Sequence, residues 1–194
     1  MKTEISLLSI IALLVLSQSL CAQGGTDQTV TQNPLTTQER GRNIITQKQY
    51  ENITYNGHTI AQLNSIANDE ELLYDIFGSP SSKSVSSFGS INYKFTGLDL
   101  GYYAQVENPY ISGITATSRS ALTVKVLGKS IRVGDSFEDL KQQFGDDLKI
   151  LYTPELDPDY SISFNSEFNE WDGLLIDLDI STNKINEITY FINP

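Results

Sequence analysis

The sequence predicts an α+β fold of two tandem units, each with one helix and a three- to four-stranded antiparallel meander. Three observations indicate this fold. A short hairpin pattern with a glycine in its turn occurs twice, a helical pattern ended by glycine follows each hairpin, and alternating apolar residues follow each helix. Because the same order of elements occurs twice, we expect an internal duplication, with a first unit over 39–123 and a second over 124–194.

The chain begins with a segment typical of a secretory signal peptide. Lys2 supplies a positive charge, an apolar run covers 5–16, and Ala22 is a small residue at the expected cleavage position. The run is too short for a membrane span, which takes roughly 20 apolar residues. We therefore expect removal of residues 1–22, a secreted or periplasmic protein and no transmembrane segment, with lipidation at Cys21 as the alternative. Residues 23–38 are polar and are expected to form a disordered tether.

The composition excludes several kinds of chemistry. Cleavage at this position removes Met1 and Cys21, the only methionine and cysteine, and leaves His58 as the only histidine. A lone histidine cannot form a multi-histidine metal site, and no nucleophile motif accompanies it. Phosphate-loop, zinc and dinucleotide motifs are absent from the sequence, so we expect no cofactor. The net charge of −11, with no basic stripe, disfavours nucleic acid as a partner.

In the first unit, residues 39–48 are expected to form a short helix with Ile44 and Ile45 facing inward. The pair Asn56-Gly57 is the strongest two-residue hairpin signal and lies between two short β-type runs. This turn places Tyr55 opposite His58 and Ile53 opposite Ile60. A helix over 69–78 follows, with acidic residues in its first turn and a glycine at its end. Strands are then expected over 91–95, 98–102 and 114–126.

The second unit repeats this order. Leu127-Gly128 is the turn of its hairpin, and a helix is expected over 136–145. Ser136 can cap this helix, with Asp139 in the reciprocal position of a capping box. Alternating apolar residues predict three further strands, over 160–165, 174–180 and 188–192.

The start of the second helix resembles a known family. Ile131–Leu140 (IRVGDSFEDL), with Phe144-Gly145 at the helix end, is similar to the helix-start motif of the small outer-membrane lipoprotein and β-lactamase-inhibitor-like superfamily. Its members are exported proteins with a helix or helix pair before an antiparallel meander, and the inhibitors are tandem duplications. The first unit lacks the glycine of this motif, with Ile66–Asn68 in its place. The resemblance implies a protein that binds other proteins and is not an enzyme; it assigns no binding residue.

Carboxylates gather in the second unit, where no Lys or Arg occurs between 150 and 183. Glu155, Asp157 and Asp159 have the spacing that starts a calcium loop, but the glycine and the final glutamate of such a loop are missing. Asp177 and Asp179 project from the polar side of one strand. A solvated acidic surface, weak calcium binding and docking of a basic partner remain the alternatives.

Aromatic residues supply the other candidate surface. Tyr102, Tyr103 and Tyr110 lie in a tyrosine-rich stretch that is expected to be an irregular connection, and Trp171 heads a later strand. Tyrosine gives large contact area at low entropic cost, although packing in the sheet core is the other interpretation of Tyr102.

Together these features predict an exported, non-enzymatic protein-binding module, either inhibitor-like or scaffold-like. Its partner is expected to be another exported or envelope protein, with a basic partner as one option. The candidate contact residues are Tyr102, Tyr103, Tyr110, Trp171, Asp177 and Asp179. The alternative is a glycan-binding protein or a carboxylate-dependent glycan hydrolase, in which Glu170 and Asp177 are the carboxylates to test.

Overall fold

The computed structural model describes residues 39–104, 106–153 and 157–192. The predictions for the signal peptide, the lipidation of Cys21 and the tether therefore lie outside the described residues. Among the helices that are described, none has the length and the apolar composition that a membrane crossing requires.

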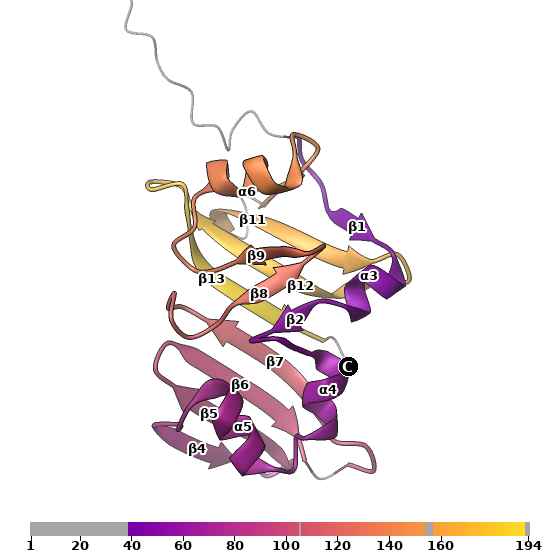
Figure 1. Ribbon diagram of the computed structural model, residues 1–194, viewed down its shortest axis with the longest axis vertical. Helices are drawn as coiled ribbons and strands as arrows, with labels where there is room; N and C mark the ends of the chain where they lie inside the picture. Colours follow the sequence, from indigo (N-terminus) through magenta and orange to yellow (C-terminus); the bar gives the residue numbers. More distant parts are fainter. Residues whose placement is uncertain (1–38, 105, 154–156, 193–194) are drawn as a thin grey trace, which may run out of the picture. The chain divides into compact units, whose positions relative to one another are not determined.

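A nine-stranded sheet is the framework of the fold (Figure 1). Its strands are β1 (Asn43–Ile45), β4 (Ser82–Val85), β5 (Ser90–Phe95), β6 (Leu98–Tyr103), β7 (Tyr110–Ala116), β10 (Leu151–Thr153), β11 (Asp157–Ser166), β12 (Asn169–Asp179) and β13 (Lys184–Phe191). The order is β1-β11-β12-β13-β7-β6-β5-β4. β10 pairs with the first part of β11, and β1 pairs with its last part. All neighbours are antiparallel except β1 and β11.

A second, four-stranded sheet contains both predicted hairpins. Its strands are β2 (Thr54–Tyr55), β3 (His58–Thr59), β8 (Val124–Val126) and β9 (Lys129–Ile131), in the order β3-β2-β8-β9. The turn residues Asn56-Gly57 and Leu127-Gly128 all have positive φ, as the favoured two-residue hairpin turn requires. Because β2 pairs with β8, the two hairpins form one sheet.

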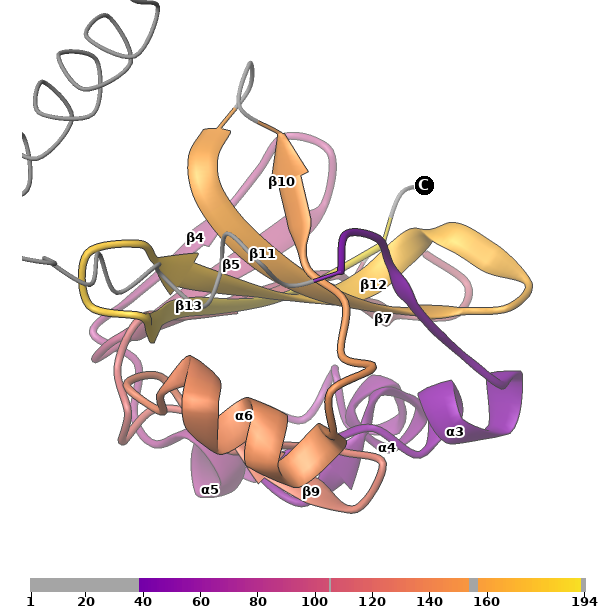
Figure 2. The same cartoon turned by 90° about the horizontal axis from the view of Figure 1, so that it is seen from above.

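Four short helices and the small sheet cover one face of the large sheet. The helices are α3 (Gln47–Glu51), α4 (Ile60–Ser65), α5 (Glu70–Phe77) and α6 (Phe137–Phe144). Figure 2 shows them together with β9 on one side of the large sheet, while on the other side β10 and the adjoining part of β11 rise from it. Within the described chain, the other face of the sheet therefore carries no helix.

Aromatic rings join the covering layer to the large sheet. Four pairs have ring centroids 5.4 to 6.0 Å apart, and each such pair contributes roughly 0.5–1.5 kcal/mol beyond its buried area. The pairs are Tyr55 with Tyr190, Tyr74 with Tyr93, Phe77 with Phe95, and Phe144 with Phe164. The inward residues of the alternating strands thus form one core under the helices and the small sheet.

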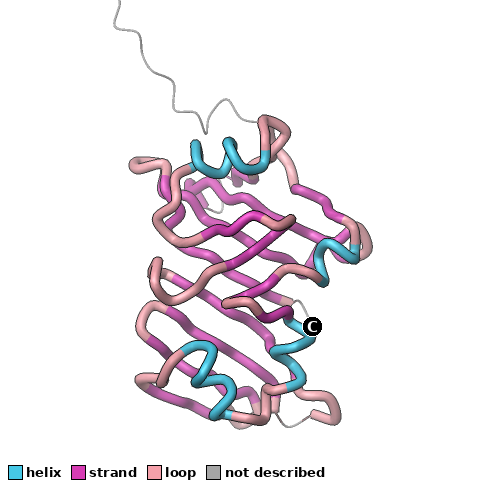
Figure 3. Tube along the Cα trace, in the orientation of Figure 1, coloured by secondary structure: helices cyan, strands magenta, loops and turns pink. Residues whose placement is uncertain are grey.

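The prediction of an α+β fold with two tandem helix-and-meander units is wrong. The described chain is mostly β, as the strand colouring in Figure 3 shows, and its helices are short. The strands do not form one separate meander per unit. β7 pairs with β13, with Thr115 opposite Thr189, and this pair joins the strands of both predicted meanders into a single sheet. Alternation along a strand indicates which side chains are buried, but it does not indicate which strand edges pair.

Two local predictions in the first half are also wrong. Residues 39–48 do not form a helix: Asn43–Ile45 is β1, in which Ile44 is exposed, and α3 begins after it. The second strand of the first hairpin stops at Thr59, which caps α4. Ile60 therefore begins a helix and does not pair across the hairpin.

The two predicted helices are confirmed. Asp69 caps α5 and Ser136 caps α6, and the glycine after each helix, Gly78 or Gly145, has a positive φ. In α6 the capping box is complete, because Ser136 and Asp139 each accept a hydrogen bond from the other's backbone N–H.

Candidate functional site

The uncovered face of the large sheet carries mostly small and polar side chains, together with Leu175 and Phe191, and Ser163 at its β11 end is buried. On each strand these residues alternate with the buried apolar set, so they point away from the core. One row across β11, β12, β13, β7, β6 and β5 contains Ser163, Leu175, Thr189, Thr115, Asp99 and Lys94. The next row, from β12 to β5, contains Gly173, Phe191, Gly113, Gly101 and Asn92.

A groove of about 440 Å³ lies on this face over two paired glycines, Gly101 and Gly113. A Cβ atom at Gly101 would lie 3.0 Å from Ser112 Oγ and 3.1 Å from Asn92 Oδ1. The absence of a side chain at Gly101 therefore lets these two polar groups approach the backbone. Neither side chain forms a hydrogen bond within the described part of the chain, so both are available to a ligand.

Two tyrosines lie at the end of this face. Tyr103 ends β6 and Tyr110 begins β7, and their rings are cross-strand neighbours with centroids 5.2 Å apart. Both rings are partly exposed. Phe88, with 88% of its surface exposed, lies in the adjacent turn, because the backbone N–H of Ala104 donates to the Gly89 carbonyl. The end of the face thus exposes aromatic surface of the kind that suits recognition.

The third tyrosine of the predicted surface, Tyr102, does not lie there. Its side chain is 2% exposed and stacks on Tyr93 in the core, with ring centroids 5.8 Å apart. The two phenol oxygens lie 3.4 Å apart. The expected irregular connection is also shorter than predicted, since residues 101–103 belong to β6. Side chains alternate along that strand, so Tyr102 and Tyr103 point to opposite faces.

The two predicted aspartates have different surroundings. Asp177 lies on the uncovered face and accepts a hydrogen bond of 2.5 Å from Ser161 Oγ. Glu187, on the neighbouring strand β13, lies opposite it. Asp179 instead holds the β12–β13 turn, where it accepts from Ser181 N at 2.7 Å and from Ser181 Oγ. These hydrogen bonds lower the pKa of Asp179. Asp177 and Glu187 therefore form the acidic pair of the face.

Several candidate side chains lie outside the description. Trp171 and Glu170 are on β12, but only their backbone is described, and Glu155 falls in the undescribed segment 154–156. Asp157 and Asp159 are placed on β11 by their backbone alone. The structure therefore gives no geometry for the calcium-loop prediction or for a hydrolase with Glu170.

His58 has the position that the hairpin pattern predicts. It pairs with Tyr55 across the turn, and its Nδ1 lies 3.2 Å from the Asn56 carbonyl oxygen. Among the described residues, no group of three or more His, Cys, Asp and Glu could hold a metal ion.

Of the predicted contact residues, Tyr103, Tyr110 and Asp177 lie on this face, whereas the features of the face that depend on strand pairing were not predicted. Glu187 joins Asp177 only because β12 and β13 are adjacent, and the groove exists only because Gly101 and Gly113 are opposite each other. No local pattern in the sequence marks either pair.

Comparisons with known proteins identify no family for this chain. No family model matches the sequence, and no curated protein matches it. A 1.5 Å crystal structure of an extracellular protein containing an SCP domain from Bacillus anthracis str. Ames is similar over 64% of this chain. That match has 14% sequence identity and a TM-score of 0.36, and it spans 43% of the other chain. The resemblance of Ile131–Leu140 to the inhibitor-like superfamily stays a prediction.

Proposed function

We propose that the protein is an exported, non-enzymatic binding module that holds a basic protein partner on the uncovered face of its large sheet. The observation that carries this proposal is the arrangement of that face. It presents the acidic pair Asp177 and Glu187 on β12 and β13 and the ring pair Tyr103 and Tyr110 on β6 and β7. The amino-terminal leader supports export, and the absence of catalytic motifs from the sequence supports a non-enzymatic role.

Charge complementarity supports a basic partner. The chain has a net charge of −11, and Asp177 and Glu187 place two carboxylates opposite each other on neighbouring strands of this face. A Lys or Arg of a partner would be attracted to this pair. The tyrosine pair would then supply contact area that does not depend on salt.

The test is a capture experiment in which the mature chain retains its partner protein. The unaltered chain is compared with two double variants of the face. Tyr103→Ala with Tyr110→Ala removes the rings, and Asp177→Asn with Glu187→Gln removes the charges. We expect one basic protein to be retained by the unaltered chain, lost with the charge variant, and weakened at least ten-fold with the ring variant.

The matched control is Glu71→Gln with Glu138→Gln, which removes two exposed carboxylates from helices on the opposite side of the sheet. This variant should retain the partner. Equal loss with the control and the charge variant would show that only net charge matters. Undiminished capture by both face variants would refute the proposed surface.

A glycan is the second candidate ligand, because of the groove over Gly101. Asn92 and Ser112 have side chains there that form no hydrogen bond with other described residues, and Lys94 Nζ lies 3.9 Å from Asp99 Oδ2 at its edge. Such groups suit a hydroxyl-rich ligand. Binding to a glycan array that Asn92→Ala abolishes, with no protein captured, would favour this candidate. Glycan turnover that Asp177→Asn abolishes would instead indicate a hydrolase.

A further inference from the structure

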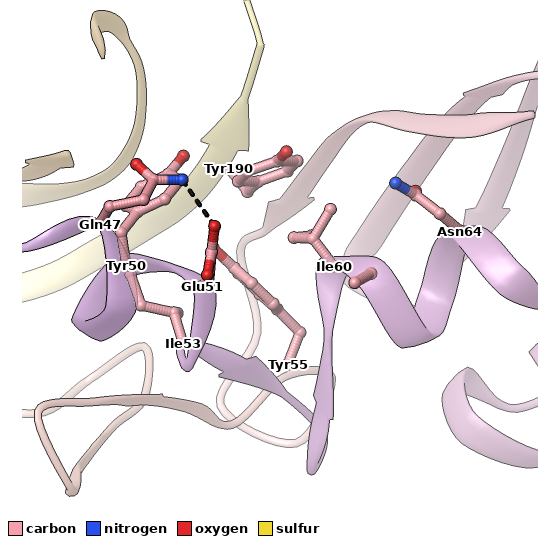
Figure 4. Close-up of a pocket in the computed structure, with 9 residues that line it drawn as sticks. Gln47, Tyr50, Glu51, Ile53, Tyr55, Ile60, Asn64 and Tyr190 are labelled. Atoms are coloured by element: carbon pink, nitrogen blue, oxygen red, sulfur yellow. Dashed lines mark hydrogen bonds between the residues drawn. The ribbon is translucent and has the colours of Figure 1, made fainter. Parts of the chain in front are cut away.

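A second cavity lies on the covered side of the large sheet, apart from the face described above. It has a volume of about 220 Å³, is partly open to solvent, and is lined by residues of α3, β2, α4 and β13 (Figure 4). Drug-sized ligands occupy pockets of roughly 300–1,000 Å³, so this cavity suits a smaller chemical group.

Three tyrosines line the cavity. Tyr55 and Tyr190 are 1% and 5% exposed, and their rings meet edge to face with centroids 5.5 Å apart. Tyr50, from α3, is the third, and its buried phenol oxygen has no hydrogen-bond partner among the described residues. Tyr55 and Tyr190 thus pack mainly on each other at the base of the cavity, and Tyr50, which is partly exposed, is the most accessible of the three.

The charged groups near the cavity are negative. Glu51 lines the same cavity as Tyr55 and Tyr190 (Figure 4). Glu51 is an exposed residue at the mouth of the cavity, and Gln47 Nε2 donates to its Oε1 at 2.8 Å. Among the described residues that line the cavity there is no Lys or Arg.

A second carboxylate acts on the same phenols. Burial raises the pKa of Tyr50 and of Tyr190, and the charge of Asp172 raises both further. Both phenols thus stay neutral at physiological pH. The cavity combines neutral tyrosine side chains with the Glu51 carboxylate, and the Asp172 carboxylate is close enough to act on two of the phenols.

We propose that this cavity binds the head group of a small organic ammonium ion, through the tyrosine rings and the Glu51 carboxylate. A cation is attracted to the negative face of an aromatic ring, and this attraction is stronger where water is excluded. A carboxylate at the mouth favours the charged ligand over a neutral one of the same shape. Anions are disfavoured, because Glu51 and Asp172 would repel them.

The test compares two ligands of matched shape in a titration followed by NMR of the tyrosine side chains. Choline carries the ammonium charge, whereas 3,3-dimethylbutan-1-ol replaces its nitrogen by carbon and is neutral. We expect choline to shift the resonances of Tyr50, Tyr55 and Tyr190 and to bind at least ten-fold more tightly than the alcohol. Equal affinities for the two ligands, or no shift with millimolar choline, would overturn the proposal.

Variants separate the two parts of the interaction. Glu51→Gln should weaken choline several-fold and leave the alcohol unchanged, while Glu71→Gln, an exposed carboxylate outside the cavity, should change neither. Tyr50→Phe keeps the ring and removes a hydroxyl that has no partner, so it should retain binding. Tyr50→Leu should lose it. Thermal unfolding of each variant shows whether the fold is intact.

A lysine side chain is an ammonium ion of the same class, and Nα-acetyl-lysine amide is the probe for it. Binding of this probe more tightly than choline would overturn the assignment to a small free ligand. If the unaltered protein does not bind choline, the proposal for the uncovered sheet face is not affected, because the two sites share no residue.

Discussion

Asn56 and Thr123 lie 67 positions apart and exchange two hydrogen bonds. The Asn56 backbone N–H donates to the Thr123 carbonyl at 2.9 Å, and the Thr123 N–H donates to Asn56 Oδ1 at 2.8 Å. Asn56 Nδ2 also lies 3.3 Å from the carbonyls of Ile76 and Ala121. One turn residue thus joins the first hairpin to the end of α5 and to the segment before the second hairpin.

We expect Asn56→Ala to destabilise the protein by about 2–3 kcal/mol. The substitution leaves a backbone N–H of Thr123 without its acceptor, and it places alanine at a φ of 49° that favours asparagine or glycine. Urea unfolding measures the change. Asn56→Gly tolerates the positive φ and loses only the side-chain hydrogen bonds, so it should cost less. Equal losses for the two variants would show that backbone strain contributes nothing.

A methyl group at Gly97 should be far more costly than one at Gly128. Both glycines have positive φ, at 72° and 78°, so the backbone strain is similar. At Gly97 a Cβ would lie 2.2 Å from Ser118 Cβ, whereas at Gly128 nothing lies within 4 Å. We expect Gly97→Ala to lose about 2–4 kcal/mol and Gly128→Ala about 1 kcal/mol. Adding Ser118→Gly to Gly97→Ala should recover part of the loss in a double-mutant cycle.

Tyr102→Ala should destabilise the protein much more than Tyr103→Ala. Tyr102 is buried against Tyr93, so its truncation leaves a cavity and should cost about 3–5 kcal/mol of stability. Tyr103 is partly exposed, so its truncation should cost less than about 1 kcal/mol. Thermal unfolding measures both. A large loss of stability with Tyr103→Ala would mean that this ring is structural, and binding defects of that variant would then say nothing about the surface.

Glu70 should make stability depend on pH in the acidic range. Hydrogen bonds from Lys83 and from Tyr74 hold its pKa below the usual glutamate value. Because the pKa is lowered in the folded state, the contribution is complete above the ordinary glutamate pKa and is lost as the pH falls through the folded value.

Its size should be below about 1 kcal/mol, since the side chain is 40% exposed. Unfolding free energies from pH 7 downward measure the effect, and Glu70→Gln should reduce the slope. The exposed Glu71→Gln serves as the control. An unchanged slope in Glu70→Gln would contradict the role of this carboxylate.

The sequence predicted the features that depend on near neighbours. The turn at Asn56-Gly57, the cap at Ser136, and the inward residues of β11 to β13 follow from short-range chemistry and alternation. Thr59 shows the limit of such reasoning, because a β-branched residue after a hairpin turn suits a strand and also caps a helix. In the structure Thr59 caps α4, and Ile60 is the first residue of that helix.

Other elements have no periodic pattern of apolar residues in the sequence. All four residues of the edge strand β4 are exposed, so Ser82–Val85 shows no alternation of apolar and polar residues. The pairing of β2 with β8 and of β7 with β13 connects distant segments. The candidate site also depends on pairing between distant segments. The sequence indicated single residues, and the order of the strands determines which of them share a face.

The two halves of the chain are joined along three strand pairs, β1 with β11, β2 with β8, and β7 with β13. A backbone cut between Ala116 and Val124 would leave fragments whose open edges complement each other, so neither would be stable alone. Mixed together, the fragments should reassemble into the intact fold. The arrangement that prevents the halves from being independent domains therefore makes the protein a candidate for fragment complementation, in which recovery of the folded state reports that two attached proteins have met.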